Sequence, residues 1–319
     1  MDFVIRKTTE LSEKEKKSLL DCFIEVFDNK RSLEEMYNQY ANTPMGYSIH
    51  SLCLDNGQVV AAHTAFPSYY WVGEQKVKTY ITGDTMVRKG YRDGAIYLDV
   101  TMGLTSYMKN AGYGFVFGFP NENSYAVIKK GCLAVEFGRL DTYILPYRIG
   151  GIKRRLAWLN PLTKLFCKIW LFRCSFGAKE EVFKPLVHKD DESYNPPRYK
   201  RLDGDYCHVL NEETEFYFKI KKHEGVRTAF LIDVIGKSEK SFQNAVKNLL
   251  EKEKDNIDLL MYVGHLPKEI CKIGLIKVPR KIEPKHFYMT GKVLDKSLDT
   301  KRIYDINSWD VNLSDYDLI

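Results

Sequence analysis

A loop between a strand and a helix is the part of this sequence best suited to bind a phosphate group. Residues 83–97 read GDTMVRKGYRDGAIY, in which a β-type run ends at Val87 and a helical run starts near Ala95. The first backbone N–H groups of a helix have no partner within it, and the helix dipole places partial positive charge beside them. A pyrophosphate would suit such a junction.

This loop resembles the acetyl-CoA signature of the GNAT N-acyltransferases. In that family a strand ends in V-x-P-x-Y-R, which is followed by x-x-G and a helix. Val87, Tyr91 and Arg92 match this pattern without gaps, whereas Lys89 stands in place of the proline and Ala95 in place of the glycine. Ile96 and Tyr97 match the apolar and aromatic pair that usually follows.

A second segment resembles the next strand and helix of the same family. Residues 115–125 read FVFGFPNENSY, with a strand that stops at Pro120-Asn121 and a helix from about Ser124 to Lys130. The resemblance covers residues 1–150 in the order of elements, and single residues match only in 83–97 and 115–133.

The resemblance implies acetyl-CoA as co-substrate, with its pantetheine arm between two strands that splay apart. Strand backbone and polar side chains would hold it. The residues expected to contact acetyl-CoA are Met86, Val87, Arg92, Asp93, Gly94, Ala95, Ile96, Asn121 and Ser124.

The resemblance also gives candidates for the transfer step. A neutral amine must lose a proton as it attacks the thioester, and the departing thiolate can accept one. Asp84, on the strand before the loop, is the candidate base, although a structural carboxylate is an equal alternative. Tyr125 is the candidate acid, against ordinary packing or substrate contact. Cys132 is interpreted as a core thiol, because no His or Asp lies near it in sequence.

Hydrophobic periodicity predicts mixed α/β structure along the chain. Asp55-Asn56-Gly57 between two β-type runs is a hairpin signal, and the sequence from Ser12 to Glu15 has the form of a helix capping box. In the first half we expect strands at 3–6, 47–54, 59–70, 77–87, 113–119 and 135–145, and helices from 12 and over 32–40, 95–110 and 124–130.

The second half repeats the later part of this order more weakly. We expect strands at 215–221, 226–234, 257–264, 275–278 and 286–293, and helices over 237–254 and 267–273. The fold class is therefore predicted as two GNAT-like α/β domains, each a mostly antiparallel, splayed sheet flanked by helices. The predicted division is a catalytic domain at 1–150, a basic helical linker at 151–203 and a degenerate copy at 204–319.

The basic excess of the chain lies in its middle. Between Lys153 and Arg201 there are 12 Lys/Arg against 5 Asp/Glu, whereas the whole chain carries a net charge of +6. Over 156–176 the apolar residues Leu159, Leu162, Phe166, Ile169 and Trp170 share one helical face. We expect this face to be buried between the two halves; the alternative is a helix that rests on anionic lipid.

Composition also bears on disulfides, metal sites, membrane spans and nucleic acid binding. The seven cysteines are scattered without C-x-x-C spacing, which is typical of reduced thiols in a cytoplasm, and the seven histidines form no metal-ligand pattern. We expect no metal, no membrane span and no nucleic acid partner.

The sequence thus predicts a cytoplasmic enzyme that transfers an acetyl group from acetyl-CoA to a primary amine by direct attack in a ternary complex. Two alternatives stay open. A Fem-type aminoacyl transferase would use charged tRNA, and a non-catalytic module would bind CoA without turnover.

Overall fold

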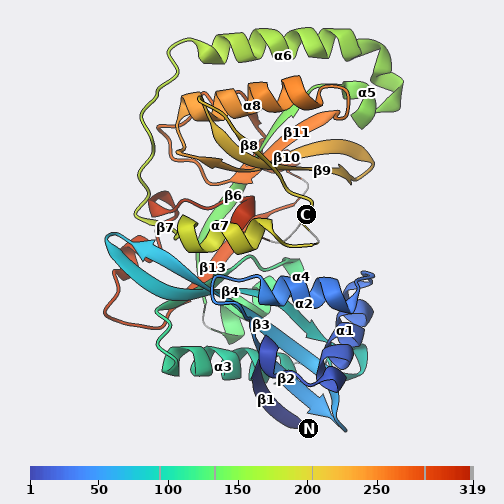
Figure 1. Ribbon diagram of the computed structural model, residues 1–319, viewed down its shortest axis with the longest axis vertical. Helices are drawn as coiled ribbons and strands as arrows, with labels where there is room; N and C mark the ends of the chain where they lie inside the picture. The colour runs from blue at the N-terminus through green and yellow to red at the C-terminus, as the bar shows by residue number, and fades with distance from the viewer. Residues whose placement is uncertain (93–94, 133, 203, 284, 317–319) are drawn as a thin grey trace. The chain divides into compact units, whose positions relative to one another are not determined.

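The computed structural model describes residues 1–92, 95–132, 134–202, 204–283 and 285–316 (Figure 1). The chain forms two compact units, and each of them is assembled from separate stretches of sequence. Unit 1 comprises Met1–Gly138, Leu186–Gly204 and Phe287–Ser308, and unit 2 comprises Arg139–Pro185, Asp205–His286 and Trp309–Ile319. These units differ from the contiguous division at 150 and 203, because local sequence patterns do not show which distant segments join one sheet.

Unit 1 is built on a sheet in the order β1-β2-β3-β4-β5-β13, in which β4 and β5 are parallel and the other neighbours antiparallel. Its strands are β1 (Asp2–Lys7), β2 (Ile49–Asp55), β3 (Gln58–Val72), β4 (Gln75–Val87), β5 (Phe115–Gly118) and β13 (Phe287–Val293), and β7 (Val187–Lys189) pairs with the end of β3. Its helices are α1 (Glu13–Phe27), α2 (Leu33–Ala41), α3 (Ala95–Asn110), α4 (Glu122–Gly131), α7 (Asp191–Tyr199) and α9 (Thr300–Ile303).

Local chemistry explains several of these boundaries. Asn56 and Gly57 both have positive φ, 50° and 73°, as a two-residue type I′ hairpin turn requires between β2 and β3. The predicted capping box at Ser12 is confirmed, since its side chain accepts the N–H of Glu15 while the Glu15 carboxylate accepts the N–H of Ser12. α3 begins and ends at the predicted residues.

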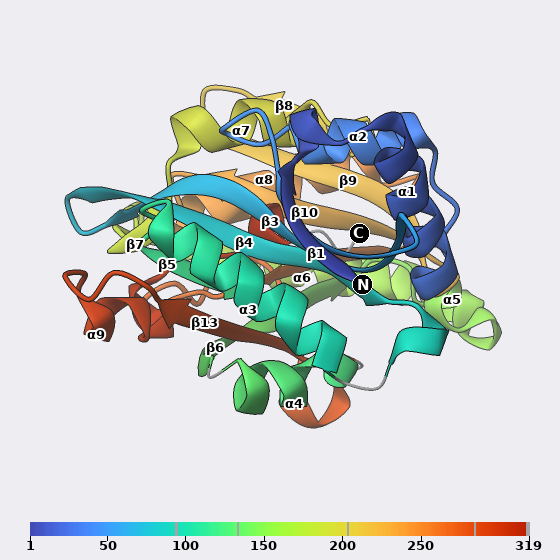
Figure 2. The ribbon, with the colours of Figure 1, turned by 90° about the horizontal axis from the view of Figure 1, so that it is seen from below.

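Helices cover both faces of the unit 1 sheet (Figure 2). On one face α1 and α2 pack against Leu52, Ala62 and Met86. On the other face α3 packs against strand neighbours of these residues, including Cys53 and Val87. This alternation follows the pleat, in which successive side chains point to opposite faces.

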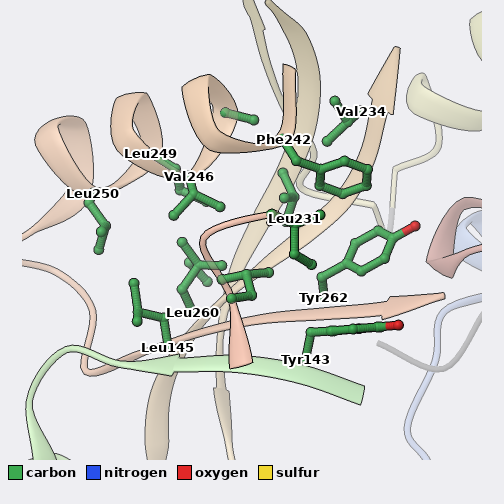
Figure 3. Packing of buried hydrophobic residues seen from close by; sticks show 14 of the residues in the cluster. Tyr143, Leu145, Leu231, Val234, Phe242, Val246, Leu249, Leu250, Leu260 and Tyr262 are labelled. Atoms are coloured by element: carbon green, nitrogen blue, oxygen red, sulfur yellow. The ribbon is translucent and has the colours of Figure 1, made fainter. Parts of the chain in front are cut away.

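Unit 2 has its own sheet in the order β6-β11-β10-β9-β8, with β12 beside β6. Its strands are β6 (Val135–Pro146, in unit 2 from Arg139), β8 (Cys207–Leu210), β9 (Glu215–His223), β10 (Val226–Ile235), β11 (Leu259–Gly264) and β12 (Ile276–Lys277), and its helices are α5 (Ile149–Ile152), α6 (Asn160–Ser175) and α8 (Glu239–Glu253). Figure 3 shows Phe242, Val246 and Leu249 of α8 packed on Leu231 and Tyr262 of the sheet, all buried.

Two sequence predictions for unit 2 differ from the structure. Residues 267–273 are irregular, with a turn at 268–269, rather than a helix. Of the α6 face expected to be buried, Leu162, Phe166 and Ile169 are exposed, whereas Trp170 packs against the unit 2 core. The buried side carries Cys167, Leu171 and Cys174, since α6 is apolar on two opposite sides and periodicity does not say which one packs. In unit 1, α7 was not predicted; Pro196 and Pro197 lie inside it.

Two buried histidines make the stability of unit 1 sensitive to acid. His50 is fully buried between the hydroxyls of Thr8 and Thr64, each 3.0 Å from a ring nitrogen. Burial lowers the pKa of His50 to about 3 and that of His63 to about 4, whereas an unfolded histidine titrates near 6.5. As the pH falls below 6.5, these two histidines become protonated in the unfolded chain but stay neutral in the folded chain. The free energy of unfolding therefore declines.

We predict that lowering the pH from 7.5 to 5 reduces the free energy of unfolding of the wild-type protein by about 2 kcal/mol more than that of His50→Gln. The variant lacks one of the two buried histidines. Denaturant unfolding at both pH values measures this difference. The exposed His223→Gln substitution is the matched control and should lose as much as wild type. Equal losses in wild type and His50→Gln would contradict the prediction.

Candidate functional site

The parting of β4 from β5 is the central feature of the candidate site. The two strands pair only over Thr79–Ile81 and Phe115–Phe117, whereas β4 continues to Val87. Beyond this short ladder Gly118 faces Thr82 so closely that a Cβ at Gly118 would lie 2.2 Å from Thr82 Oγ1. Past this point the β4 backbone has no partner strand on the β5 side among the described residues.

A β-bulge in β4 turns the strand at the same place. Asp84 and Thr85 of β4 oppose the single residue His63 of β3, and Asp84 adopts a left-handed conformation with φ of 44°. Such a bulge bends the strand and redirects its side chains. The Asp84 carboxylate accepts a hydrogen bond of 2.9 Å from the hydroxyl of Tyr40, which is fully buried.

A small cavity of about 40 Å³, lined by apolar side chains together with several threonines, His63 and Lys292, lies where the strands part. The residues that line it come from β3, β4, β5, α3, α4, β13 and the segment after α4: His63, Thr82, Val116, Phe117, Gly118, Thr101, Thr105, Ile128, Cys132, Ala134, Thr290, Gly291 and Lys292. The Lys292 ammonium group donates to the carbonyl of Cys132 at 3.3 Å. The predicted core thiol Cys132 is thus a buried wall of this cavity, and burial raises its pKa.

His63 is the titratable side chain in the cavity wall that the sequence reasoning missed. Its Nδ1 lies 2.7 Å from Thr85 Oγ1, and burial lowers its pKa to about 4, so the imidazole is neutral at physiological pH. A neutral imidazole can accept a proton. In the sequence His63 lies in an apolar run, AAHTAF, and only the bulge shows that it faces the end of β4.

The predicted phosphate loop leads from β4 to α3 through a short 3₁₀ turn at Lys89–Tyr91. Arg92 donates from Nε to the carbonyl of Val87 at 2.9 Å, and Tyr91 donates to the Asp55 carboxylate at 2.7 Å. α3 starts at the exposed Ala95.

The side chains of Met86, Val87 and Ile96 are buried in the core, so only their backbone groups could reach a ligand. Asp93 and Gly94 lie outside the described residues.

Asn121 and Ser124 lie together at the start of α4. The Asn121 side chain accepts the N–H of Ser124 at 3.0 Å, which makes it the N-cap of the helix. The Ser124 hydroxyl lies 3.1 Å from Asn121 Oδ1. Their expected contact with acetyl-CoA stays a prediction, and the geometry adds a structural role for the pair.

Tyr125 takes part in a surface cluster. Its hydroxyl donates a hydrogen bond to the Glu136 carboxylate, and the Lys129 ammonium group lies 3.1 Å from the same hydroxyl. The bond to Glu136 is the main reason that the pKa of Tyr125 is raised. The ring of Tyr288 lies 4.7 Å from that of Tyr125. Tyr125 is not among the residues that line the cavity.

Unit 2 repeats the strand-to-helix arrangement with different chemistry. β10 and β11 are parallel over Thr228–Leu231, and α8 follows β10. At the start of α8, Glu239 accepts backbone N–H groups of Lys179, Cys271 and Lys272. Although burial favours the protonated form, these bonds lower the pKa of Glu239 to about 2. A fixed carboxylate therefore lies where the first unit has the exposed start of α3.

In the part of the chain that the structure describes, no group of three or more His, Cys, Asp or Glu side chains could hold a metal ion. All seven cysteines are free thiols. None of the described helices is long and apolar enough to cross a membrane.

Comparison with solved structures identifies the fold. The chain superposes with a GCN5-related N-acetyltransferase from Kribbella flavida (TM-score 0.58, 12% identity, 92% of this chain and 71% of the other). It also superposes with Eis1 from Mycobacterium abscessus (0.55, 14%, 92% and 74%) and with a GCN5-related N-acetyltransferase from Anabaena variabilis (0.57, 10%, 92% and 73%). No protein-family model and no curated protein sequence matches the chain.

This protein therefore has the mixed α/β fold of the GNAT N-acetyltransferases, as the sequence resemblance predicted. The similarity extends over both units, at sequence identities that show the fold alone.

The close approach of Gly118 to Thr82 gives a test of the geometry at the parting point. We predict that Gly118→Ala destabilises the protein by about 1–3 kcal/mol, because the new methyl group would overlap the Thr82 hydroxyl. In a Thr82→Ala background the same substitution should cost much less, since the overlapping atom is gone. Denaturant unfolding of the four proteins forms a double-mutant cycle. Equal costs in both backgrounds would show that the two strands do not meet there.

Proposed function

We propose that this protein is an acyl-CoA-dependent N-acyltransferase that moves an acetyl group from acetyl-CoA to a primary amine by direct attack in a ternary complex. The observation that carries the proposal is the cavity at the point where β4 and β5 diverge, with His63 in its wall, in the unit where the start of α3 is exposed. The N-acetyltransferases that share the fold support the reaction class.

The acetyl-CoA thioester would bind where β4 and β5 diverge. The pyrophosphate suits the start of α3, where the backbone N–H groups of the first turn, beginning at Ala95, carry partial positive charge. The pantetheine arm contains two amides, and the end of β4, which has no partner strand on the β5 side among the described residues, offers it strand-like hydrogen bonds. The acyl end would then reach the cavity beside His63.

The transfer forms one bond and breaks one. The amine nitrogen attacks the thioester carbonyl carbon, the C–S bond breaks, and CoA leaves as a thiolate. The proton lost from the amine needs an acceptor. We propose His63 as a transient acceptor, because it lines the cavity and its imidazole is neutral; since burial disfavours the imidazolium, the proton would pass on to the departing thiolate.

Asp84 remains the alternative base from the sequence. Its carboxylate already accepts the Tyr40 hydroxyl, and it shapes the bulge that faces His63. The backbone N–H near Val87 would polarise the thioester carbonyl, as the family resemblance implies. Tyr125 could protonate the thiolate only by leaving its bond to Glu136, and a thiolate can depart without that proton.

Ligand binding tests the phosphate position. We expect wild-type protein to bind acetyl-CoA with micromolar affinity, and Ala95→Glu to raise the Kd at least tenfold, because a carboxylate would meet the pyrophosphate. The same substitution suits a helix N-terminus, so the fold should remain stable. Isothermal titration calorimetry measures the affinity.

Ser106→Glu, at an exposed position of the same helix, adds the same charge and is the matched control. It should bind acetyl-CoA like wild type. Absence of binding to the intact protein would overturn the proposal and direct attention to charged tRNA, whereas binding without release of CoA in any amine screen would identify a non-catalytic module.

Kinetics distinguish the two candidate bases. We predict that His63→Gln lowers kcat at least 100-fold with an unchanged Kd for acetyl-CoA, in the range expected for loss of a general base. Asp84→Asn keeps a side-chain oxygen that can accept the hydrogen bond of Tyr40, and it should lower kcat less than tenfold. CoA release with an amine acceptor found by screening gives the rates. The reverse order of effects would assign the base to Asp84.

A further inference from the structure

The outer side of α6 carries a row of large apolar side chains that face solvent. Trp158 is 73% exposed, Phe172 66% and Phe176 67%. We call this surface the outer face of α6; its members are Trp158, Leu162, Leu165, Phe166, Ile169, Phe172 and Phe176. Scattered apolar residues on a surface are ordinary, but seven on one helical segment form a contiguous patch of the kind that marks an interaction site.

The opposite side of α6 is held firmly within unit 2. Cys167 and Leu171 belong to the unit 2 core, and the indole of Trp170 donates to the carbonyl of Gly274 at 3.1 Å. Gln243 of α8 donates to the carbonyl of Cys174 at 2.8 Å. Within unit 2, α8 lies between α6 and the sheet (Figure 1). Because its inner side is already packed, α6 cannot roll over to bury the outer face without giving up these contacts.

The segment that carries the outer face has charges of one sign. Residues 153–176 contain six Lys/Arg and no Asp or Glu. Lys153, Arg154 and Arg155 are exposed just before the helix, and Lys168 and Arg173 are exposed on the helix itself, whereas Lys164 lies over the ring of Tyr147. An apolar strip with Trp and Phe, on a segment whose exposed charges are all cations, has the composition of helices that lie in the interface of an anionic membrane.

We propose that the outer face of α6 docks the protein on the surface of a membrane that contains anionic phospholipids. The aromatic and aliphatic side chains would enter the boundary between headgroups and acyl chains, and the five exposed cations of the segment would meet lipid phosphates and carboxylates. The proposal does not depend on the proposed acetyl transfer.

The positive charge beside the outer face of α6 disfavours a second copy of this chain as its partner. A twofold dimer would place the same surface of both copies in contact. From residues 153–176, each copy would bring five exposed positive charges and no negative one to that contact. Like charges across an interface oppose association, whereas anionic lipid supplies the missing negative charge.

Flotation with lipid vesicles tests the proposal. The full chain should float with vesicles of 30% phosphatidylserine in phosphatidylcholine and should remain unbound with phosphatidylcholine alone. The triple variant Leu165→Gln, Ile169→Gln, Phe172→Gln should lose at least 90% of the bound fraction. The double variant Lys168→Gln, Arg173→Gln should lower the partition coefficient about 25-fold, since each cation near such a surface contributes about fivefold.

Matched controls lie elsewhere in unit 2. Ile282→Gln removes a single exposed apolar side chain, and Lys221→Gln, Lys222→Gln removes two exposed cations. Both should bind vesicles like wild type, and circular dichroism and thermal unfolding should show that every variant is folded.

Other results would overturn the proposal. Failure of the wild-type chain to bind anionic vesicles would do so, and so would equal binding to neutral vesicles or full binding by the folded triple variant. If sedimentation shows wild-type dimers that the triple variant cannot form, with no vesicle binding, the outer face is a self-association surface. Binding to tRNA that the double variant loses, again without vesicle binding, would make it a nucleic acid surface.

Discussion

The bulge at Asp84 is the constraint on which the candidate site depends. A regular β4 would continue its pairing with β3 and keep one face of the strand toward α3. Instead two residues of β4 oppose His63, one of them with a left-handed backbone that a non-glycine residue adopts at a cost of roughly 1 kcal/mol or more. The hydrogen bond from the buried Tyr40 hydroxyl to the Asp84 carboxylate helps to hold that conformation. β4 and β5 diverge next to this bend, and the cavity that His63 lines lies beside the end of β4.

The two units have similar topology but differ in the chemistry at the start of the helix that follows the parallel strand. Each has parallel strands that pair briefly, followed or bridged by a helix that packs on the sheet. In unit 1 the start of the helix is exposed and the strand ends are lined by threonines. In unit 2 the Glu239 carboxylate at the start of α8 accepts backbone N–H groups of three residues from other segments, and Asn312 bonds to the buried Asp233 near the end of β10. The N–H of Ser241 in the first turn of α8 is accepted by the side chain of Ser238. A side-chain cap and a carboxylate thus lie where unit 1 has the exposed start of α3.

Local patterns predicted the parts of the fold that local chemistry determines. The Asn56-Gly57 turn, the Ser12 capping box and α3 are set by residues within a few positions of one another. His63 was missed because its neighbours in sequence are apolar, and its partner Thr85 is brought to it by strand pairing. The two-sided apolar pattern of α6 did not show which side packs, since Cys167, Leu171 and Cys174 are smaller than the aromatic residues opposite. The joining of β13 to β5 depends on contacts about half the chain length apart, which no window of sequence contains.

The order in which the ribosome makes this chain bears on when the cavity can exist. β13 pairs Thr290 with Gly118 and Lys292 with Val116, so the wall that it supplies comes from residues synthesised some 170 positions after the strand beside it. All of unit 2 up to His286 is made in the interval. Until β13 arrives, β5 is an open sheet edge with unpaired backbone groups, which other chains could pair with. The nascent protein thus passes through a stage in which most of unit 2 has been made while the cavity still lacks one wall, and the last segment of unit 2, Trp309–Ile319, follows only after β13.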